Sequence, residues 1–421
     1  MRLKYIMPDW DDYIDPNFDF EKDEFSANNK AERNDIYIYE LMGDASPCNG
    51  ILVSLAQLIK KKGALKNHDT SNENPVTVRE IMRIPKRLIV MGDCGAFTYK
   101  GNDEPAFTPE EAAKIYETLG FDIGASVDHM IVAEKETVDE KGNKKKVPLT
   151  EEELRKRIDI TNKNAEKFIK EVRERNYKFT PMGTIQGITK EDYAEAFKKY
   201  VQLGYEHIAL GSLVPKKDEE ILEIIKAIGK EYKKLPAKKK EKISIHLFGV
   251  LRPKLYKYYK ENGITSFDSI SFFRKAWLRS SKNYLGVNGE WYAALRVPQS
   301  TLPQNIKKIK KKKISLVKVA NLEKRVLETL SKYDKHQISL EETLKLLIKY
   351  DKLFERSSED GDRIRDAYER TLRDRPWETC DCPICKEIGI HVVIFRGSNR
   401  NKRRGFHNTI VFYNDLMKIR L

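Results

Sequence analysis

Long apolar runs are missing from this chain of 421 residues, and cysteine is scarce, with five in all. No apolar stretch approaches the roughly 20 residues needed to cross a bilayer, so we expect no membrane contact. The start of the chain also lacks the apolar core and small-residue cleavage site of a secretory signal. We therefore expect a cytoplasmic protein whose thiols stay reduced.

Acidic residues are the minority among the charged ones. The chain carries 64 aspartates and glutamates against 79 lysines and arginines, which gives a formal net charge of +15. Such an excess suits a polyanionic partner such as nucleic acid. A solvated surface or growth at high temperature gives the same composition, so charge alone leaves these interpretations open.

Apolar, β-branched strings alternate with amphipathic stretches along much of the chain. The string at 87–93 precedes a stretch at 108–120 with a threonine N-cap, a proline at the first helical position and a closing glycine. We predict further strands at 121–128, 178–186, 205–211, 243–249 and 264–268, and an earlier one at 36–41. This alternation predicts a parallel sheet, either closed as a barrel or open and doubly wound.

Polar residues stand at or just after the carboxyl ends of these predicted strands, namely Asp93, Asp128, Gln186, Ser212 and Asp268. In a (β/α)8 barrel all of those ends meet at one mouth. An open sheet would gather ligands at one switch point, and no Gly-x-Gly-x-x-Gly motif follows the first strand. The sequence therefore favours an α/β fold of the (β/α)8 TIM-barrel type.

Two domains are expected, because the chain is longer than one barrel of about 250 residues. We place the barrel at 1–300 and a basic, helical extension with a metal site at 301–421. A lysine tract at 307–313 lies near the start of the extension, where it could contact phosphates or form a solvated surface. Helical periodicity follows at 322–353. Within the barrel, the charged run at 134–146 predicts an exposed loop or hairpin.

The extension contains the predicted metal site. Three cysteines and one histidine have the residue types of a closed, structural Zn2+ site: Cys380, Cys382, Cys385 and His407. His391 is the rival fourth ligand, but it lies in an apolar string that is typical of a core strand. The basic segment at 396–404 could meet phosphates or form a solvated loop. Cys48 and Cys94 stand apart and are interpreted as buried small hydrophobes.

Two aspartates stand in surroundings suited to sugar chemistry. Asp93 lies in Gly-Asp-Cys-Gly-Ala-Phe, where small neighbours admit a flat ligand and Phe97 could stack on it. Asp268 lies in Ser-Phe-Asp-Ser-Ile, again at a strand end. Paired carboxylates at an anomeric carbon allow glycosyl transfer with retention, one as nucleophile and the other as acid and base. The alternative is that these aspartates cap helices or brace loops.

Several motifs, taken in order, resemble those of the tRNA-guanine transglycosylases. They are Gly-Asp-Cys-Gly-Ala-Phe at 92–97, Ser-Val-Asp-His at 126–129, Gly-Thr-Ile-Gln-Gly at 183–187, Ala-Leu-Gly-Ser-Leu at 209–213 and the Cys-x-Cys-x-x-Cys…His metal motif. The resemblance spans most of the chain. Within this superfamily the chain looks most like the DpdA branch, which places 7-deazaguanine bases into DNA instead of tRNA. Asp-Cys-Gly-Ala-Phe, Ser-Val-Asp-His and Phe-Arg-Lys-Ala-Trp carry that closer likeness.

The resemblance implies a role for each residue of the site. It makes Asp268 the nucleophile that forms a glycosyl-enzyme and Asp93 the general acid and base. It implies that Asp128 binds N1–H and the 2-amino group of guanine through two parallel hydrogen bonds. The other implied base contacts are Gln186, Gly211 and Ser212 toward O6, and Phe97 and Phe248 as the stacking residues.

The chain departs from the tRNA enzymes where the polynucleotide should pass. The Pro-Thr-Arg that follows their nucleophile is replaced by Ile-Ser-Phe-Phe-Arg-Lys-Ala-Trp at 270–277. We therefore expect a pentosyltransferase that exchanges guanine in DNA for 7-cyano-7-deazaguanine (preQ0) or a relative, with a DpdB-type ATPase as a further partner. The alternatives are a tRNA-guanine transglycosylase and a non-catalytic nucleic-acid-binding paralogue. The presence of both Asp93 and Asp268 argues against the paralogue.

Overall fold

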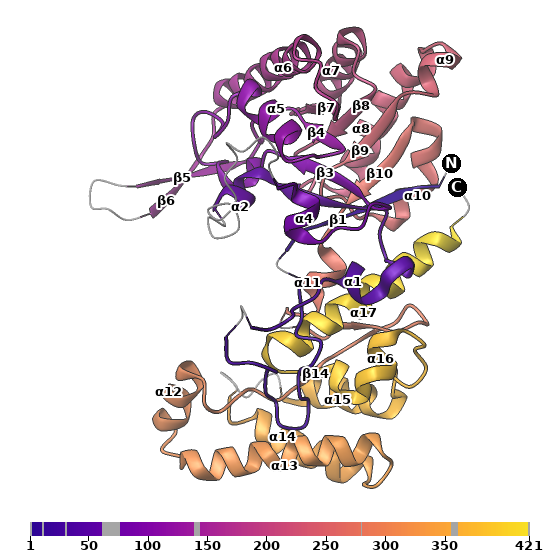
Figure 1. The fold of residues 1–421 in the computed structure, drawn as a ribbon. Coiled ribbons are helices and arrows are strands. Elements are labelled where there is room, and N and C mark those ends of the chain that lie inside the picture. Colours follow the sequence, from indigo (N-terminus) through magenta and orange to yellow (C-terminus); the bar gives the residue numbers. More distant parts are fainter. Residues whose placement is uncertain are drawn as a thin grey trace. The chain divides into compact units, whose positions relative to one another are not determined.

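The computed structural model describes residues 2–10, 12–29, 32–60, 76–138, 144–278, 280–354 and 361–419. The chain divides into two compact units (Figure 1). The first unit consists of Met1–Trp10, Cys48–Ile270 and Ile419–Leu421, and the second of Asp11–Pro47 and Ser271–Lys418. The expected boundary at residue 300 differs from this division, because 11–47 and 271–300 belong to the second unit.

The strands of the first unit close into a parallel barrel, as predicted. Around the barrel they are β1 (Lys4–Pro8), β10 (Ile264–Asp268), β9 (Ser244–Leu247), β8 (His207–Leu210), β7 (Thr180–Ile185), β4 (Ile123–Ala125), β3 (Ile89–Asp93) and β2 (Gly50–Ser54). The apolar cluster of the barrel consists of Ile6, Leu52, Met91, Ile123, Ala125, Met182 and Ala209. The interior is therefore a packed core rather than a pore, which leaves the strand ends for a site.

The predicted strand at 36–41 is wrong. Ile36 makes only an isolated bridge, and the short helix α1 (Ile38–Met42) follows it. The Glu40 carboxylate accepts a hydrogen bond of 2.8 Å from the Tyr37 N–H, which caps the first turn of α1. The barrel takes β1 and β2, which flank this region in the sequence, as its first two strands.

Four long helices follow strands of the barrel. They are α5 (Pro109–Thr118), α6 (Glu151–Glu174), α7 (Lys190–Leu203) and α8 (Asp218–Lys234). A threonine side chain caps the N-terminus of α5, α6 and α7. The charged run at 134–146 forms the predicted hairpin, with β5 (Glu134–Val138) antiparallel to β6 (Lys144–Pro148). Residues 139–143 lie outside the described residues.

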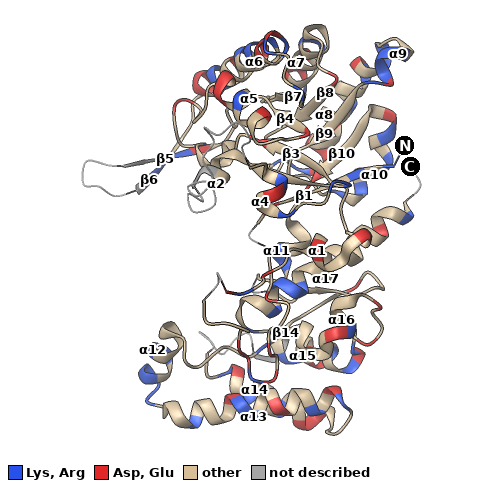
Figure 2. Ribbon diagram, viewed as in Figure 1, with Lys and Arg blue, Asp and Glu red and all other residues tan. Residues whose placement is uncertain are grey.

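Helices dominate the second unit, whose charged residues are coloured in Figure 2. In chain order after α1 they are α11 (Ser271–Lys275), α12 (Pro303–Lys311), α13 (Leu316–Asp334), α14 (Leu340–Asp351), α15 (Gly361–Asp374), α16 (Pro383–Ile388) and α17 (Gly397–Lys418). Helices α13 and α14 confirm the helical stretch predicted at 322–353. In the described ranges, no helix has the length and apolar character needed to cross a membrane.

The start of α17 is buried although it is strongly basic. Arg400, Arg403 and Arg404 are each at most 1% exposed. Arg403 pairs with Glu387 at 3.0 Å, and Arg404 donates to the backbone carbonyls of residues 276, 392 and 394. Both interpretations of 396–404, as a phosphate contact and as a solvated loop, are therefore wrong, because these guanidinium groups bind partners inside the unit.

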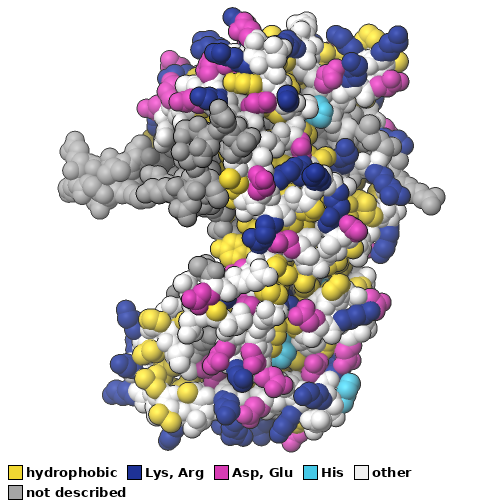
Figure 3. Space-filling view, viewed as in Figure 1, with side chains coloured by type: hydrophobic (Ala, Val, Ile, Leu, Met, Phe, Trp, Pro, Cys, Tyr) yellow, Lys and Arg dark blue, Asp and Glu magenta, His cyan; other side chains and the backbone are white. Residues whose placement is uncertain are grey.

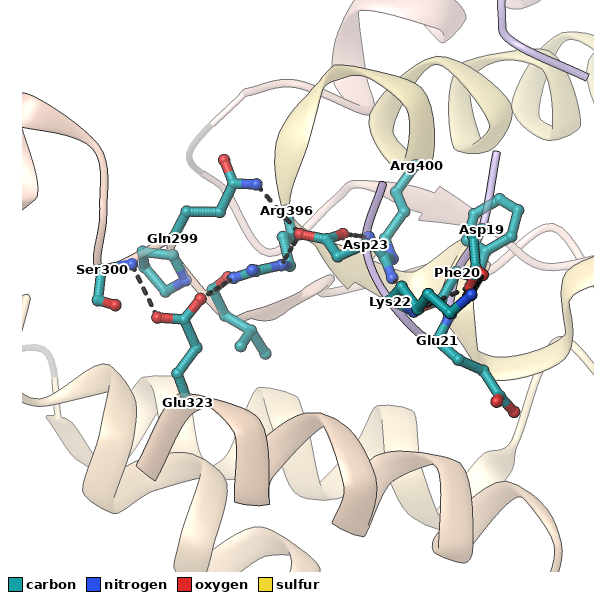
Figure 4. Close-up of polar contacts among 12 residues, drawn as sticks. Asp19, Phe20, Glu21, Lys22, Asp23, Gln299, Ser300, Glu323, Arg396 and Arg400 are labelled. Atoms are coloured by element: carbon teal, nitrogen blue, oxygen red, sulfur yellow. Dashed lines mark hydrogen bonds and ion pairs between the residues drawn. The ribbon is translucent and has the colours of Figure 1, made fainter. Parts of the chain in front are cut away.

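One acidic residue of the N-terminal segment 11–47 pairs with two arginines of the segment 396–404. Asp23 forms ion pairs with Arg400 and, at 2.6 Å, with Arg396 (Figure 4). Arg396 also pairs with Glu323 of α13 at 2.7 Å. The network thus connects the N-terminal segment to α13 and α17, which explains why 11–47 belongs to the second unit.

Candidate active site

The polar residues expected at strand ends lie at the carboxyl end of the barrel. Asp93 and Asp268 are the last residues of β3 and β10. Asp128, Gln186 and Ser212 follow β4, β7 and β8. Because the parallel strands of a closed barrel end at one rim, residues far apart in the sequence reach the same rim.

Asp128 is the centre of a buried hydrogen-bond network. The Gln186 amide donates to Oδ2 at 2.5 Å, and the Cys94 thiol donates to Oδ1 at 2.9 Å. The Tyr99 hydroxyl donates to the Asp128 carbonyl at 3.0 Å. Burial raises the pKa of Asp128. Burial and the Asp128 charge raise the pKa of the Cys94 thiol, which therefore stays protonated and able to donate.

Asp93 lies where a negative charge is disfavoured. Burial, followed by the charges of Asp128 and Asp268, raises the pKa of Asp93 to about 7. Its Oδ1 is buried and has no hydrogen-bond partner among the described residues. A carboxyl group with a pKa near neutrality can both give and take a proton, which is what a general acid and base requires.

Asp268 is held through one of its two oxygens. The Gly249 N–H donates to Oδ1 at 2.8 Å, and His246 Nε2 lies 3.1 Å from the same oxygen. His246 Nδ1 lies 2.9 Å from Ser266 Oγ. Asp268 and His246 are 5% and 2% exposed, so water competes little for these contacts.

The two expected stacking residues have different surroundings. Phe97 is 66% exposed, on the 3-10 turn Ala96–Thr98, and Lys100 Nζ lies 3.9 Å from its ring centre. Phe248 packs against the apolar core of the barrel, and its ring centre is 4.9 Å from that of His246. Phe97 is thus open to a ligand, whereas Phe248 is anchored in the barrel.

Gly211 and Ser212 shape the backbone beyond β8. A Cβ at position 211 would lie 2.2 Å from the Gln186 amide nitrogen, so any other residue there would displace the Gln186 amide from its present position. The Gly211 N–H already donates to the Ile185 carbonyl at 2.9 Å. Ser212 has a left-handed backbone, with a φ of 54°, and its hydroxyl accepts from the Ile131 N–H at 2.9 Å. Both residues therefore fix the chain beside Gln186.

The second unit brings together the four expected metal ligands, Cys380, Cys382, Cys385 and His407. Their ligand atoms all lie within 4.8 Å of one another. His407 Nδ1 is 3.6, 3.4 and 3.3 Å from the three sulfurs. A tetrahedral ion with Zn–S of about 2.3 Å and Zn–N of about 2.1 Å would place them about 3.6 Å apart. His407 Nε2 donates to the Leu285 carbonyl at 2.7 Å, which leaves Nδ1 for a metal. This cluster, which excludes His391, could hold a metal ion.

Sequence reasoning missed two functional groups of the barrel site. Cys94 is buried, as expected, but its thiol is also a donor to Asp128. His246 is not among the residues predicted from the sequence, and it lies between Ile245 and Leu247 near the end of β9. Because side chains alternate along a strand, His246 points to the opposite face from these two apolar residues. That polar residue in an apolar strand was the signal that could have found it.

Comparisons with known proteins add the family. Residues 92–291 match the TGT family, described as queuine tRNA-ribosyltransferase. A DNA-guanine transglycosylase from Salmonella montevideo is 36% identical over 419 residues, which cover 99% of this chain and 97% of that protein. A tRNA-guanine(15) transglycosylase from Methanococcus aeolicus is 29% identical over 188 residues, or 44% of this chain and 26% of that protein. Its counterpart from Methanococcus vannielii is 26% identical over 203 residues, or 48% of this chain and 28% of that protein.

These matches agree with the motifs and with the barrel. The DNA-guanine transglycosylase aligns along nearly the whole of both chains, which fits the predicted likeness to the DpdA branch. The two tRNA-guanine(15) transglycosylases from Methanococcus align with less than half of this chain. The chain therefore belongs to the guanine transglycosylase superfamily and is a guanine transglycosylase.

Proposed function

We propose that this enzyme replaces guanine in DNA with preQ0 or another 7-deazaguanine base. The observation that carries the proposal is the set of three carboxyl groups at the barrel rim, since paired carboxylates suit glycosyl transfer with retention. Asp128 and Asp268 are buried, and Asp93 is partly buried with a buried Oδ1. DNA as the substrate is supported by the relative that is 36% identical along 99% of this chain and is named for guanine in DNA. The altered segment at 270–277, which replaces a motif of the tRNA enzymes, also favours DNA.

Asp268 is the proposed nucleophile. Gly249 and His246 occupy Oδ1, whereas Oδ2 has no hydrogen-bond partner within the described ranges. Oδ2 attacks C1′ of the deoxyribose while the bond from C1′ to the guanine nitrogen breaks, which gives a glycosyl-enzyme ester. The incoming base then attacks C1′ from the face that guanine left, and two inversions retain the configuration.

Asp93 moves the proton in both half-reactions. Its pKa of about 7 allows the protonated form to donate to the guanine that leaves. The carboxylate that results accepts a proton from the incoming base as this base bonds to C1′ and releases Asp268. Asp93 therefore ends each cycle in the protonation state in which it began.

Asp128 recognises the base edge. A carboxylate offers about four lone-pair sites, of which Cys94 and Gln186 use one each. Two sites remain for N1–H and the 2-amino group. Guanine and 7-deazaguanines share these groups, so the same contacts serve the outgoing and the incoming base. Toward O6 we assign the Gln186 amide and the Ser212 hydroxyl as donors, with Gly211 leaving the space that the Gln186 amide occupies. For stacking we assign Phe97 and Phe248.

We assign Zn2+ to the cluster of Cys380, Cys382, Cys385 and His407. Three thiolates and one imidazole complete a tetrahedral shell without an open position, so the ion stabilises the second unit and takes no part in base exchange. We further propose a DpdB-type ATPase as a partner and the cytoplasm as the compartment. A target base inside a duplex must be unstacked before the enzyme can reach C1′. The proposed role of the ATPase is to open the duplex for this step.

Incubation with labelled guanine and duplex DNA, single-stranded DNA or tRNA tests the proposal. We expect label to enter DNA, and excess unlabelled preQ0 to suppress this entry. Label that enters tRNA alone would replace the proposal with the tRNA-guanine transglycosylase. Failure to label any of the three, with the ATPase partner present, would favour the non-catalytic paralogue.

A further inference from the structure

We propose that His246 is a positioning residue that aims the Asp268 carboxylate at C1′, with Ser266 fixing the orientation of its ring. The inference rests on the proposed function, in which Asp268 is the nucleophile. Its basis is the buried row of side chains Ser266, His246 and Asp268, in which the imidazole touches one neighbour with each nitrogen.

The pairing of β9 with β10 builds this row. Ser266 is the cross-strand partner of His246, and the register shifts between Ile264 and Ser266. The shift inserts Thr265 as one extra residue on β10, and such bulges re-aim side chains beside active sites. Ser266 and Asp268 are two positions apart, so their side chains lie on one face of β10. The imidazole of His246 meets both of them there.

The partners determine where the imidazole carries its proton. An ionised Asp268 can only accept, so His246 Nε2 must donate to Oδ1. The Ser266 hydroxyl can then donate to Nδ1. The imidazole thereby carries a proton on Nε2, and the ring cannot turn without loss of both hydrogen bonds.

Two donors on Oδ1 have two consequences for the nucleophile. The Gly249 N–H and His246 Nε2–H make two hydrogen bonds to Oδ1, and hydrogen bonds to a carboxylate are stronger than those between neutral groups. They also fix the carboxylate by one oxygen and leave Oδ2 to attack. In the ester, Oδ1 is the carbonyl oxygen, and the same donors stabilise the charge that returns to it when the incoming base releases Asp268.

A pair of His246 variants separates donation from packing. His246→Phe keeps a ring but removes the donor, whereas His246→Gln can place an amide N–H near the former Nε2. We expect His246→Phe to slow formation of the covalent enzyme–DNA adduct about 100-fold to 1,000-fold in single turnover, with unchanged affinity for the free base. His246→Gln should recover most of the rate. His207→Gln, on the neighbouring strand β8, is the matched control and should react like the wild type.

Nuclear magnetic resonance of protein labelled with 15N-histidine gives a readout that needs no turnover. The signal lost in His246→Gln assigns the residue, and we expect a proton on Nε2 of the unliganded enzyme. A neutral ring with its proton on Nδ1 would overturn the inference. So would wild-type adduct formation by a folded His246→Phe, or a His246→Gln variant as slow as His246→Phe. If the wild type forms no adduct with any DNA, the proposed function fails, while the proton position still decides the role of His246.

Discussion

The barrel rim of the first unit and the start of α17 in the second both bury charged groups, in opposite ways. At the rim, burial raises the pKa of Asp93, and the charges of Asp128 and Asp268 raise it further. None of the three aspartates pairs with lysine or arginine within the described residues. In α17, Arg396 and Arg400 share Asp23. Burial opposes ionisation of Asp23, yet the charges of Arg400 and Arg396 hold its pKa below the usual value.

We interpret this difference as a role in catalysis for the rim and a role in stability for the start of α17. Like charges kept together without counter-ions reduce stability, and proteins tolerate them where a proton must move near neutral pH. Opposite charges with satisfied hydrogen bonds join distant segments, and removal of one partner leaves the other buried and unpaired. We therefore expect variants at the rim to lose activity without unfolding, and variants in the second unit to unfold without a change in the chemistry.

The largest expected effect on folding is the removal of the metal from the second unit. Structural zinc contributes apparent binding free energies of about 10 kcal/mol or more in small zinc domains, so Cys382→Ala should abolish zinc binding and unfold this unit. Elemental analysis should find one zinc per chain in the wild type and none in the variant. Cys48→Ala, which alters a cysteine outside the cluster, is the control and should keep the ion. A wild-type protein that folds without zinc would contradict the assignment.

At the barrel rim, Asp268→Ala should have the largest effect on activity. Without a nucleophile no glycosyl-enzyme can form, so we expect base exchange to fall by at least about 10⁴-fold and the adduct with DNA to vanish. Denaturing gels of protein incubated with DNA and a base analogue measure the adduct, and thermal unfolding shows whether the variant stays folded. An adduct that persists, or that maps to another residue, would contradict the role of Asp268.

Asp93→Asn tests the role of the rim through the pH dependence of base exchange and of stability. Exchange should fall about 10²-fold to 10⁴-fold and lose the ionisation near pH 7. Because burial raises the pKa of Asp93 from 3.8 to about 7, the folded state binds its proton more tightly than the unfolded state. That stabilisation is complete below pH 3.8 and is lost as the pH rises through 7.

Unfolding of the wild type and of Asp93→Asn at several pH values measures this loss. The variant should gain at least about 1 kcal/mol in free energy of unfolding relative to the wild type between pH 4 and pH 8. A difference between the two proteins that does not change with pH would mean that Asp93 is not perturbed as described.

Asp23→Ala tests the second unit. The change leaves Arg396 and Arg400 buried without their shared partner, so it should cost about 3 to 5 kcal/mol of stability, measured by denaturant unfolding. Asp415→Ala removes a half-exposed partner of Lys418 on α17 and should cost less than about 1 kcal/mol. Equal losses in the two variants would show that burial does not distinguish these pairs.

The smallest expected effect comes from exposed charge on α12. Figure 3 shows lysine and arginine side chains gathered at the edge of the second unit where Figure 1 places this helix. Lys307, Lys310 and Lys311 are exposed there. If they contact phosphates, replacing all three by glutamine should weaken binding of every DNA sequence. The slope of log affinity against log salt concentration should become less steep, by an amount that corresponds to up to about three phosphate contacts. An unchanged salt slope would support the alternative of a solvated surface.

The barrel and its main polar groups can be predicted from the amino-acid sequence alone. Strand-and-helix alternation is a local pattern, and polar residues at parallel strand ends converge in any closed barrel, so Asp93, Asp128, Gln186 and Asp268 could be found without a structure. The candidate metal ligands could also be found, because three of them lie within six residues, Cys380–Cys385, and thiolates with an imidazole are the ligands that structural zinc prefers.

The burial of charged groups, and the partners that they contact, cannot be predicted in this way and depend on how distant segments pack. The segment 396–404 has the composition of a surface, yet Asp23, hundreds of residues away in the sequence, and carbonyls of other segments bind its arginines. The contact of His246 with Asp268 depends on a one-residue shift in strand register. Local propensity contains no information on such contacts, because the closure of the barrel and the packing of α17 create them.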